Sequence, residues 1–292
     1  MRGMIGKMLY KKERAAVLNK TMWFSLILSL TPLAPAQEPV RPNPTTTVVE
    51  AVSPQASQAC QVTYSSGTVN TATQFCVTVN GNIPMFSVRG EQLFSPSGNP
   101  GDLEGYGFCD VTAGQRYYDY AAYDNGLWNA STFRQNGNTV TVTRTTSDGN
   151  WQLTQTIVNL PATASAVGSA KVTMKLKNLS GVGRFANLLR YAGEDLAFVS
   201  NSYNTTRYSA SGQFQFAAGL MITVNNFPSG FGEQAFVQNI QSGPDPCSPL
   251  TFDDTSLPYF GLGSIVALWQ TANTTKIAPG GVVTVTSTYR GF

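Results

Sequence analysis

The segment from Arg116 to Trp128 holds the densest group of side chains that could do chemistry. Aromatic faces bind the apolar side of sugar rings, and Asp and Asn side chains exchange hydrogen bonds with hydroxyl groups. The residues of this kind are Tyr117, Tyr118, Asp119, Tyr120, Tyr123, Asp124, Asn125 and Trp128. We interpret them as a candidate carbohydrate-binding surface. The competing interpretation is that the tyrosines pack on a sheet, where aromatic residues are common.

A second candidate follows Arg190, where Glu194 and Asp195 are adjacent. Such acids could supply oxygen ligands to Ca²⁺ or direct a carboxylate at a ligand. One acidic pair has too few ligands for a metal ion, and an ion pair with Arg190 or Arg184 is the simpler interpretation. We keep Arg190, Glu194 and Asp195 as candidate ligand-binding residues, and we predict no metal site and no cofactor.

The chain contains no histidine. This absence excludes a Ser-His-Asp or Cys-His hydrolase, a histidine-ligated metal site and histidine acid-base catalysis. A glycosidase needs only two carboxylates that face each other across the substrate, so this class stays open. The candidate acids are Asp102, Glu104, Asp110, Asp119, Asp124, Glu194, Asp195, Asp253 and Asp254. Their spacing does not show which of them face each other, and we assign no catalytic residue.

Residues 1–36 resemble an export signal, and Met8 could be the true start. A basic leader precedes the apolar run Met22–Leu33, and Ala34-Pro35-Ala36 forms a small-residue cleavage site; an uncleaved membrane anchor is the alternative. The leader holds six basic residues and one acidic residue, so the net charge of +3 becomes about −2 after cleavage. This composition indicates neither a nucleic acid nor an anionic membrane as a partner. We predict a secreted or extracytoplasmic protein, in the periplasm or on the cell surface, without a membrane span after cleavage.

Residues 37–58 contain four prolines and little periodicity, which predicts a linker. We expect one folded domain over residues 59–292. An exported chain with four cysteines is expected to form two disulfides, and three connectivities are possible. Cys60 and Cys76 flank a predicted hairpin, which favours their pairing and leaves Cys109 with Cys247. Buried free thiols are the alternative.

Alternating hydrophobic and polar residues predict the central part of the fold. In 139–145 and 151–157 the apolar residues recur every second position, and Asp148-Gly149 between these runs predicts a hairpin whose central residues have positive φ. In 172–177, Val, Met and Leu alternate with Lys and Thr, as in a strand with one buried face. Much of 105–136 is dense in Gly, Tyr and Asp and is predicted as loop. Numerous short strands with regular turns predict an all-β fold, a two-sheet antiparallel β-sandwich.

Three stretches resemble the galactose mutarotase-like supersandwich domains. They are Val79–Leu93, the strand Val172–Asn178 followed by Ser180-Gly181, and the closing run Ala278–Thr286. The resemblance implies a large two-sheet supersandwich, and a sugar as a ligand class. The mutarotases of this family work with histidines, which this chain lacks, so their activity is not transferred to any position.

The sequence therefore predicts a secreted binding module without catalysis of its own, with a glycan or another cell-surface molecule as its partner. One alternative is a carbohydrate-active enzyme that uses two carboxylates. Another is a structural envelope or adhesion protein whose exposed sheet edge pairs with other chains.

Overall fold

The structure is a computed structural model. It describes residues 47–49, 59–94, 104–121, 124–194, 201–206, 209–214, 218–226, 228, 231–238, 244–248, 258–259, 263–271 and 275–292. The chain separates into residues 1–42 and residues 43–292, and everything described here belongs to the second unit. The predicted signal, residues 1–36, lies outside the described residues, as does the linker apart from 47–49.

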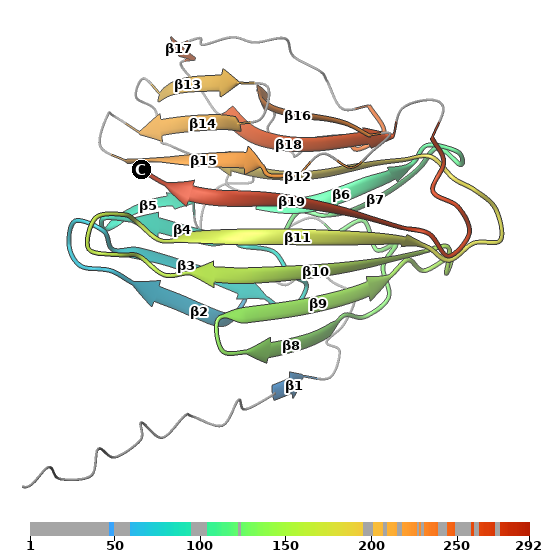
Figure 1. Cartoon of the computed structure of the whole chain (residues 1–292), viewed down its shortest axis with the longest axis horizontal. Coiled ribbons are helices and arrows are strands. Elements are labelled where there is room, and N and C mark those ends of the chain that lie inside the picture. Colours follow the sequence, from blue (N-terminus) through green and yellow to red (C-terminus); the bar gives the residue numbers. More distant parts are fainter. Residues whose placement is uncertain are drawn as a thin grey trace, which may run out of the picture. The chain divides into compact units, whose positions relative to one another are not determined.

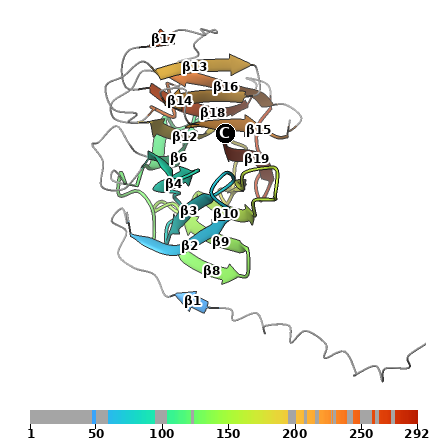
Figure 2. The same cartoon turned by 90° about the vertical axis from the view of Figure 1, so that its left-hand side faces the viewer.

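One sheet has ten antiparallel strands in the order β1-β8-β9-β10-β11-β19-β15-β14-β13-β17 (Figure 1). The last strand of the chain, β19, lies between β11 and β15. Part of the predicted linker forms β1, which pairs with β8 at the edge of this sheet (Figure 2). The strands are β1 (Thr47–Val49), β8 (Thr132–Asn136), β9 (Thr139–Thr145), β10 (Trp151–Leu160), β11 (Ser169–Asn178), β13 (Asn201–Thr206), β14 (Ser209–Phe214), β15 (Ala218–Val224), β17 (Pro258–Tyr259) and β19 (Val282–Gly291).

Two smaller antiparallel sheets contribute to the same buried core. The five-stranded sheet has the order β16-β18-β12-β6-β7, and the four-stranded sheet has the order β2-β3-β4-β5. Their strands are β2 (Cys60–Ser66), β3 (Thr73–Thr78), β4 (Met85–Val88), β5 (Glu91–Phe94), β6 (Glu104–Asp110), β7 (Gln115–Asp119), β12 (Ala186–Glu194), β16 (Phe231–Gln238) and β18 (Gly263–Thr271). The described residues contain no helix, so the predicted all-β antiparallel sandwich is confirmed.

The core follows the two-residue period of the strands. On β10, Trp151, Leu153 and Ile157 are buried, together with Gln155 in the same phase, whereas Gln152, Thr154 and Thr156 are partly exposed. On β11, Val172, Met174 and Leu176 are buried in the same phase. Together with the core residues of the smaller sheets, these side chains form one continuous hydrophobic cluster. Alternation in the sequence therefore reports which side of each strand faces the other layer.

The predicted hairpin between β9 and β10 is present, but the predicted turn geometry is wrong. Of its turn residues only Gly149 has a positive φ, +71°, and the Gly149 amide donates to the Thr146 carbonyl oxygen. The connection is longer than two residues, and such loops combine an ordinary β-turn with one left-handed residue. Asp148 therefore keeps a negative φ.

The prediction of loop for much of 105–136 is also wrong, because most of β6 and all of β7 and β8 lie there. The glycines of β6 have a packing role. A Cβ atom on Gly105 would lie 2.2 Å from the Asp119 carbonyl oxygen, and one on Gly107 would lie 3.1 Å from Tyr118 Cβ. Glycine in a strand often marks such a close approach of another backbone.

Both predicted disulfides are confirmed. Cys60 and Cys76 join the neighbouring strands β2 and β3, and Cys109 on β6 is joined to Cys247, which is 138 residues further along the chain. No described cysteine is free.

Candidate functional site

The first part of the tyrosine-rich segment, up to Asp119, lies in the edge strand β7, whose side chains point alternately to two sides. Tyr117 and Asp119 point into the core and are 2% and 0% exposed. Arg116 is exposed and Tyr118 is half-buried on the opposite side. This alternation divides the predicted surface into an inner and an outer group.

The inner group is centred on Arg144, which β9 directs into the core. Arg144 Nη1 donates to Asp119 Oδ2 at 2.7 Å, and Nη2 donates to Asp124 Oδ2 at 2.9 Å. The guanidinium also lies 5.1 Å from the ring centroid of Trp128. The side chains of Arg144, Asp119 and Asp124 are at most 2% exposed. These carboxylates are therefore occupied with an internal arginine.

A second internal cluster is centred on Arg190 of β12. Arg190 Nε lies 2.7 Å from Glu104 Oε1, and Nη1 donates to Gln155 Oε1 at 2.6 Å. The Tyr289 hydroxyl donates to the same Glu104 oxygen at 2.7 Å. Arg190, Glu104 and Tyr289 are fully buried.

The turn between β3 and β4 links the two clusters, through its backbone on the Arg190 side and through the Asn82 side chain on the Arg144 side. Arg190 Nη2 donates to the Gly81 carbonyl oxygen at 3.0 Å, and the Ile83 amide donates to Glu104 Oε2 at 2.5 Å. The Asn82 side-chain amide donates to the Asp119 carbonyl oxygen at 3.0 Å. Backbone groups of this turn thus occupy polar atoms that would otherwise be buried without a partner.

Burial shifts the pKa values of the internal acids upward. Desolvation raises the pKa of Asp119 to about 7, although the positive charge of Arg144 opposes this shift. Desolvation also raises the pKa of Glu104, opposed first by Arg190 and then by the Ile83 amide. The Arg144 cluster holds two carboxylates for one guanidinium, and the negative charge of Asp124 further raises the pKa of Asp119.

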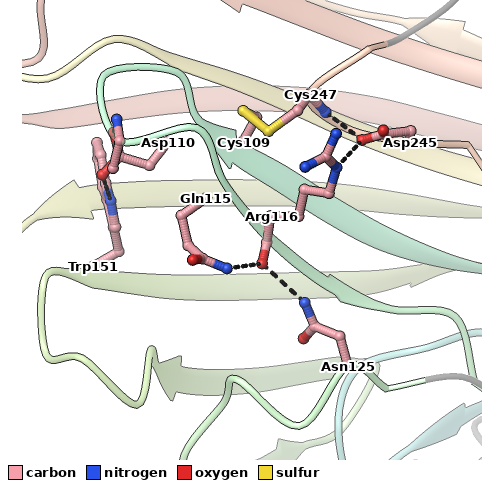
Figure 3. Close-up of a disulfide and its surroundings, with 9 residues drawn as sticks. Cys109, Asp110, Gln115, Arg116, Asn125, Trp151, Asp245 and Cys247 are labelled. Atoms are coloured by element: carbon pink, nitrogen blue, oxygen red, sulfur yellow. Dashed lines mark hydrogen bonds and ion pairs between the residues drawn. A yellow bond between two sulfur atoms is a disulfide. The ribbon is translucent and has the colours of Figure 1, made fainter.

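The outer group surrounds the long-range disulfide (Figure 3). Arg116 Nε donates to Asp245 Oδ1 at 2.7 Å, and both side chains are well exposed, at 48% and 39%. The Asn125 side-chain amide donates to the Arg116 carbonyl oxygen at 2.9 Å. The Arg116 hydrogen bond lowers the pKa of Asp245. We call Arg116, Tyr118, Asn125 and Asp245 the rim surface.

Stacked aromatic rings support the rim surface from below. Tyr118 lies on Tyr120 with ring centroids 4.7 Å apart and an interplanar angle of 18°. Tyr120 contacts Tyr191 edge-on and donates its hydroxyl to the Pro244 carbonyl oxygen. The Cys109–Cys247 disulfide and Pro244 thus tie the segment 244–248 to β6 and to the aromatic stack, which holds Asp245 beside Arg116.

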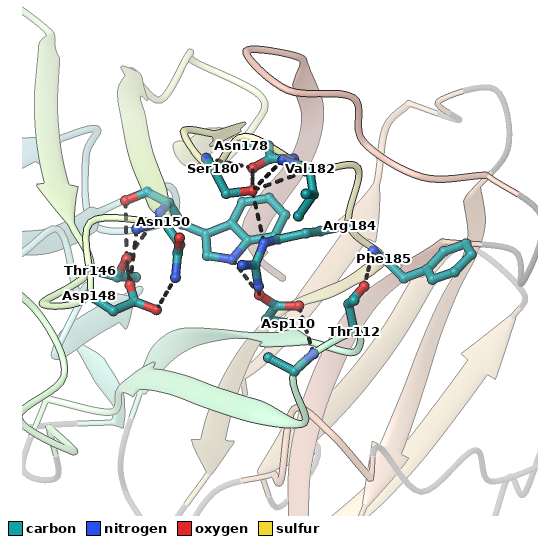
Figure 4. A network of polar contacts seen from close by, with 12 residues as sticks. Asp110, Thr112, Thr146, Asp148, Asn150, Asn178, Ser180, Val182, Arg184 and Phe185 are labelled. Carbon is teal, nitrogen blue, oxygen red and sulfur yellow. Dashed lines mark hydrogen bonds and ion pairs between the residues drawn. The ribbon is translucent and has the colours of Figure 1, made fainter.

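A third polar cluster lies at one end of β9 and β10 (Figure 4). Asp110 accepts hydrogen bonds from Trp151 Nε1, at 3.0 Å, and from Arg184. Asp148 in the hairpin turn is the exposed acid of this region. Partial burial would raise its pKa, but hydrogen bonds led by that from Thr146 outweigh burial and lower the pKa to about 2. Asp148 therefore stays ionised and bound to its own turn.

The predicted residues are accordingly dispersed. Asp119, Asp124, Trp128 and Arg190 lie inside, and Tyr118 lies on the rim surface. Tyr123, Asp195 and the side chain of Glu194 lie outside the described residues. The sequence did not predict a role in the site for the internal residues Arg144, Gln155 and Tyr289. Nor did it predict one for the rim residues Arg116 and Asp245.

The four internal acids do not form an open pair. Glu104, Asp110, Asp119 and Asp124 are all buried and each contacts an arginine. In the described residues we find no cluster of three or more Cys, Asp or Glu side chains suited to a metal ion. Nor does any helix there have the length and hydropathy to cross a membrane.

No family model and no curated protein matches the chain. Among solved structures, a bacterial glucoamylase complexed with acarbose matches with a TM-score of 0.50 and 10% identity, over 85% of this chain and 36% of that chain. A protein from Escherichia coli K12, provisionally classed as an aldose 1-epimerase, matches with a TM-score of 0.47 and 12% identity, over 79% of this chain and 99% of that chain. At these identities the likeness concerns the fold alone. At that level the glucoamylase match agrees with the large antiparallel sandwich that the resemblance implies.

Proposed function

We propose that this chain is an extracytoplasmic, non-catalytic binding module whose rim surface binds a carbohydrate. The observation that carries the proposal is the pair of stacked tyrosines, Tyr118 on Tyr120, beside the exposed Arg116–Asp245 ion pair. A half-buried tyrosine offers an aromatic face for the apolar side of a sugar ring, and the charged and amide groups beside it can bond to hydroxyls. Because the disulfide anchors this region, the surface is preorganised for a ligand.

The internal acids support the non-catalytic part of the proposal. A glycosidase needs two carboxyl groups that reach the substrate from opposite sides. Glu104 and Asp119 are fully buried, and both are engaged with arginines. Two disulfides favour an oxidising compartment outside the cytoplasm. One domain over residues 59–292, preceded by a linker and a cleaved signal at 1–36, is the organisation that we propose for the chain.

The test is a glycan array and a polysaccharide pull-down with the mature protein. We expect retention of neutral glycans without release of sugar. Tyr118→Ala should lose about five- to thirtyfold in affinity, since stacking and burial of one aromatic ring contribute roughly 1 to 2 kcal/mol. Arg116→Gln should weaken binding less. Arg89→Gln, which removes an exposed arginine from the β4–β5 turn, is the matched control and should bind like the parent protein.

Two outcomes would contradict the proposal. The first is release of reducing sugar that stops when one carboxylate is substituted, since this result would establish an enzyme. The second is failure of every glycan together with self-assembly of the protein in solution, which would favour the structural role.

A further inference from the structure

The ten strands of the large sheet contain no aspartate or glutamate. On the six strands β8, β9, β10, β11, β19 and β15, the outward residues include five cations. They are Arg134, Lys171, Lys175, Lys177 and Arg290. Apart from Lys177, which is half-buried, these side chains are exposed. One face of the sheet therefore carries positive charge alone at the described positions.

The lysines occupy the middle of this face. Lys175 on β11 lies between Thr154 of β10 and Thr284 of β19. Lys171 lies two residue pairs further along the same strand, which places it about 13 Å from Lys175. Neighbouring strands are about 4.8 Å apart, so the cations are spread over a flat area several strands wide. We call Lys171, Lys175 and Lys177, with the threonines beside them, the lysine face.

Hydroxyl groups fill the positions between the cations. Outward threonines pair across the strands, as in Thr143 with Thr154, whose Oγ1 atoms are 3.1 Å apart, and Thr173 with Thr286, at 3.3 Å. Each hydroxyl can still accept or donate a further hydrogen bond, since it has one proton and two lone pairs. The lysine face thus offers ammonium groups and hydroxyls in a regular array.

The net charge of the chain does not reveal this positive face, because the acids that balance it lie elsewhere. Glu104, Asp110, Asp119 and Asp124 are buried, and their charges are opposed by internal or half-buried arginines. Asp148, the described acid closest in sequence to β10, lies in the β9–β10 turn and binds Thr146, Tyr117 and Asn150. An anion that approaches the middle of the sheet therefore meets lysines without competing carboxylates on the same strands.

We propose that the lysine face binds a linear acidic polysaccharide, a polymer of carboxylated sugars. Ammonium groups attract the carboxylates, and the threonine hydroxyls match the sugar hydroxyls between them. The outward positions of the six strands carry no aromatic side chain on which nucleic acid bases could stack. Their exposed large apolar residues, Leu160 at the end of β10 and Val282 at the start of β19, lie at opposite ends of the face. They therefore do not form the continuous apolar surface that anchors a protein in a membrane interface. This binding goes beyond the proposed function, because it uses a different sheet and does not involve the rim surface.

The experiment compares polygalacturonate with its fully methyl-esterified form, which has the same backbone without the charge. We expect the full-length mature protein to bind polygalacturonate only, and to be released between about 0.1 M and about 1 M salt, where the Debye length falls from about 10 Å to about 3 Å. The double variant Lys171→Gln/Lys175→Gln should lose about tenfold in affinity. Arg89→Gln/Lys276→Gln removes the same charge from exposed positions elsewhere and should lose less than about twofold.

The proposal would be wrong if the two double variants lost the same affinity for polygalacturonate, or if the esterified polymer bound as well as the charged one. It would also be wrong if polygalacturonate failed to bind at low salt, even where anionic lipid vesicles or single-stranded DNA bind instead. Tyr118→Ala separates the two proposals, because it should weaken neutral glycans and leave polygalacturonate binding unchanged. Thermal unfolding followed by circular dichroism verifies that each variant is folded.

Discussion

The two sides of the ten-stranded sheet differ in whether their charged side chains are paired. Inside, Arg144 is 1% exposed and its guanidinium has two carboxylate partners. Outside, Lys171 and Lys175 are exposed, and the sheet offers them no carboxylate. A buried charge is costly unless it is paired, whereas a charge in water needs no partner. Burial on one side of a strand, rather than composition, therefore decides where the acids of this protein lie.

The largest expected effect tests the core that the inner side of the large sheet faces, which Arg190 enters from β12 of the five-stranded sheet. Arg190→Met should destabilise the protein by about 4 kcal/mol, because it leaves Glu104 buried without its cationic partner. Urea unfolding measures the change. The matched control on the outer side is Arg290→Met. Because Arg290 is exposed on β19, this change should alter the free energy of unfolding by less than about 0.5 kcal/mol. Equal losses in both variants would contradict the contrast between the two sides.

A second test addresses the turn that joins the two internal clusters. Gly81 has a φ of +88°, and a Cβ atom there would lie 2.6 Å from Gln155 Nε2. Gly81→Ala should therefore cost about 3 kcal/mol, from both backbone strain and crowding of a buried side chain. Gly149→Ala is the control, since its φ is also positive, +71°, but its Cβ would meet nothing within 4 Å. It should cost about 1 kcal/mol.

The dependence of stability on pH tests the raised pKa of Asp119, one of the two carboxylates that share the Arg144 guanidinium. In the folded protein the pKa of Asp119 is about 7, compared with an ordinary value of 3.8. Between these values the folded state binds the proton more strongly than the unfolded state, so this group makes stability fall as pH rises from about 4 to about 7. Its contribution is fully present below about pH 4. Urea midpoints measured across this range should show the fall, and Asp119→Asn should flatten it; an unchanged slope would exclude this assignment.

The smallest effect is expected on the outer side. Lys175→Gln should alter the free energy of unfolding by less than about 0.5 kcal/mol, because an exposed side chain without an ion pair contributes little to stability. The same variant should nevertheless weaken polygalacturonate binding. A large loss of stability would show instead that Lys175 has a structural role.

Much of the fold could be predicted from local pattern. The alternation in 139–145 and 172–177 places β9 and β11 and shows which residues face the core. The same alternation also marks two buried polar residues. Arg144 falls in phase with the buried Val140 and Val142, and Gln155 falls in phase with Leu153 and Ile157. A polar residue in a buried phase indicates an internal polar cluster.

The composition of the site could not be predicted, because its contacts join distant parts of the chain. Glu104 and Arg190 are 86 residues apart, and Glu104 and Tyr289 are 185 apart. Arg116 and Asp245 are brought together across 129 residues. Which loop supplies the partner of a given side chain depends on the order of strands in the sheets, and spacing along the sequence does not contain this information.

The position of β19 also determines when the large sheet can be completed. Residues 282–291 are the last strand of the chain, yet they pair with β11 on one side and β15 on the other. During synthesis, one edge of β11 and one edge of β15 therefore stay unpaired until β19 has been made. Exposed edges of this kind are prone to pair with other chains. This topology thus favours folding of the large sheet only after β19 has emerged.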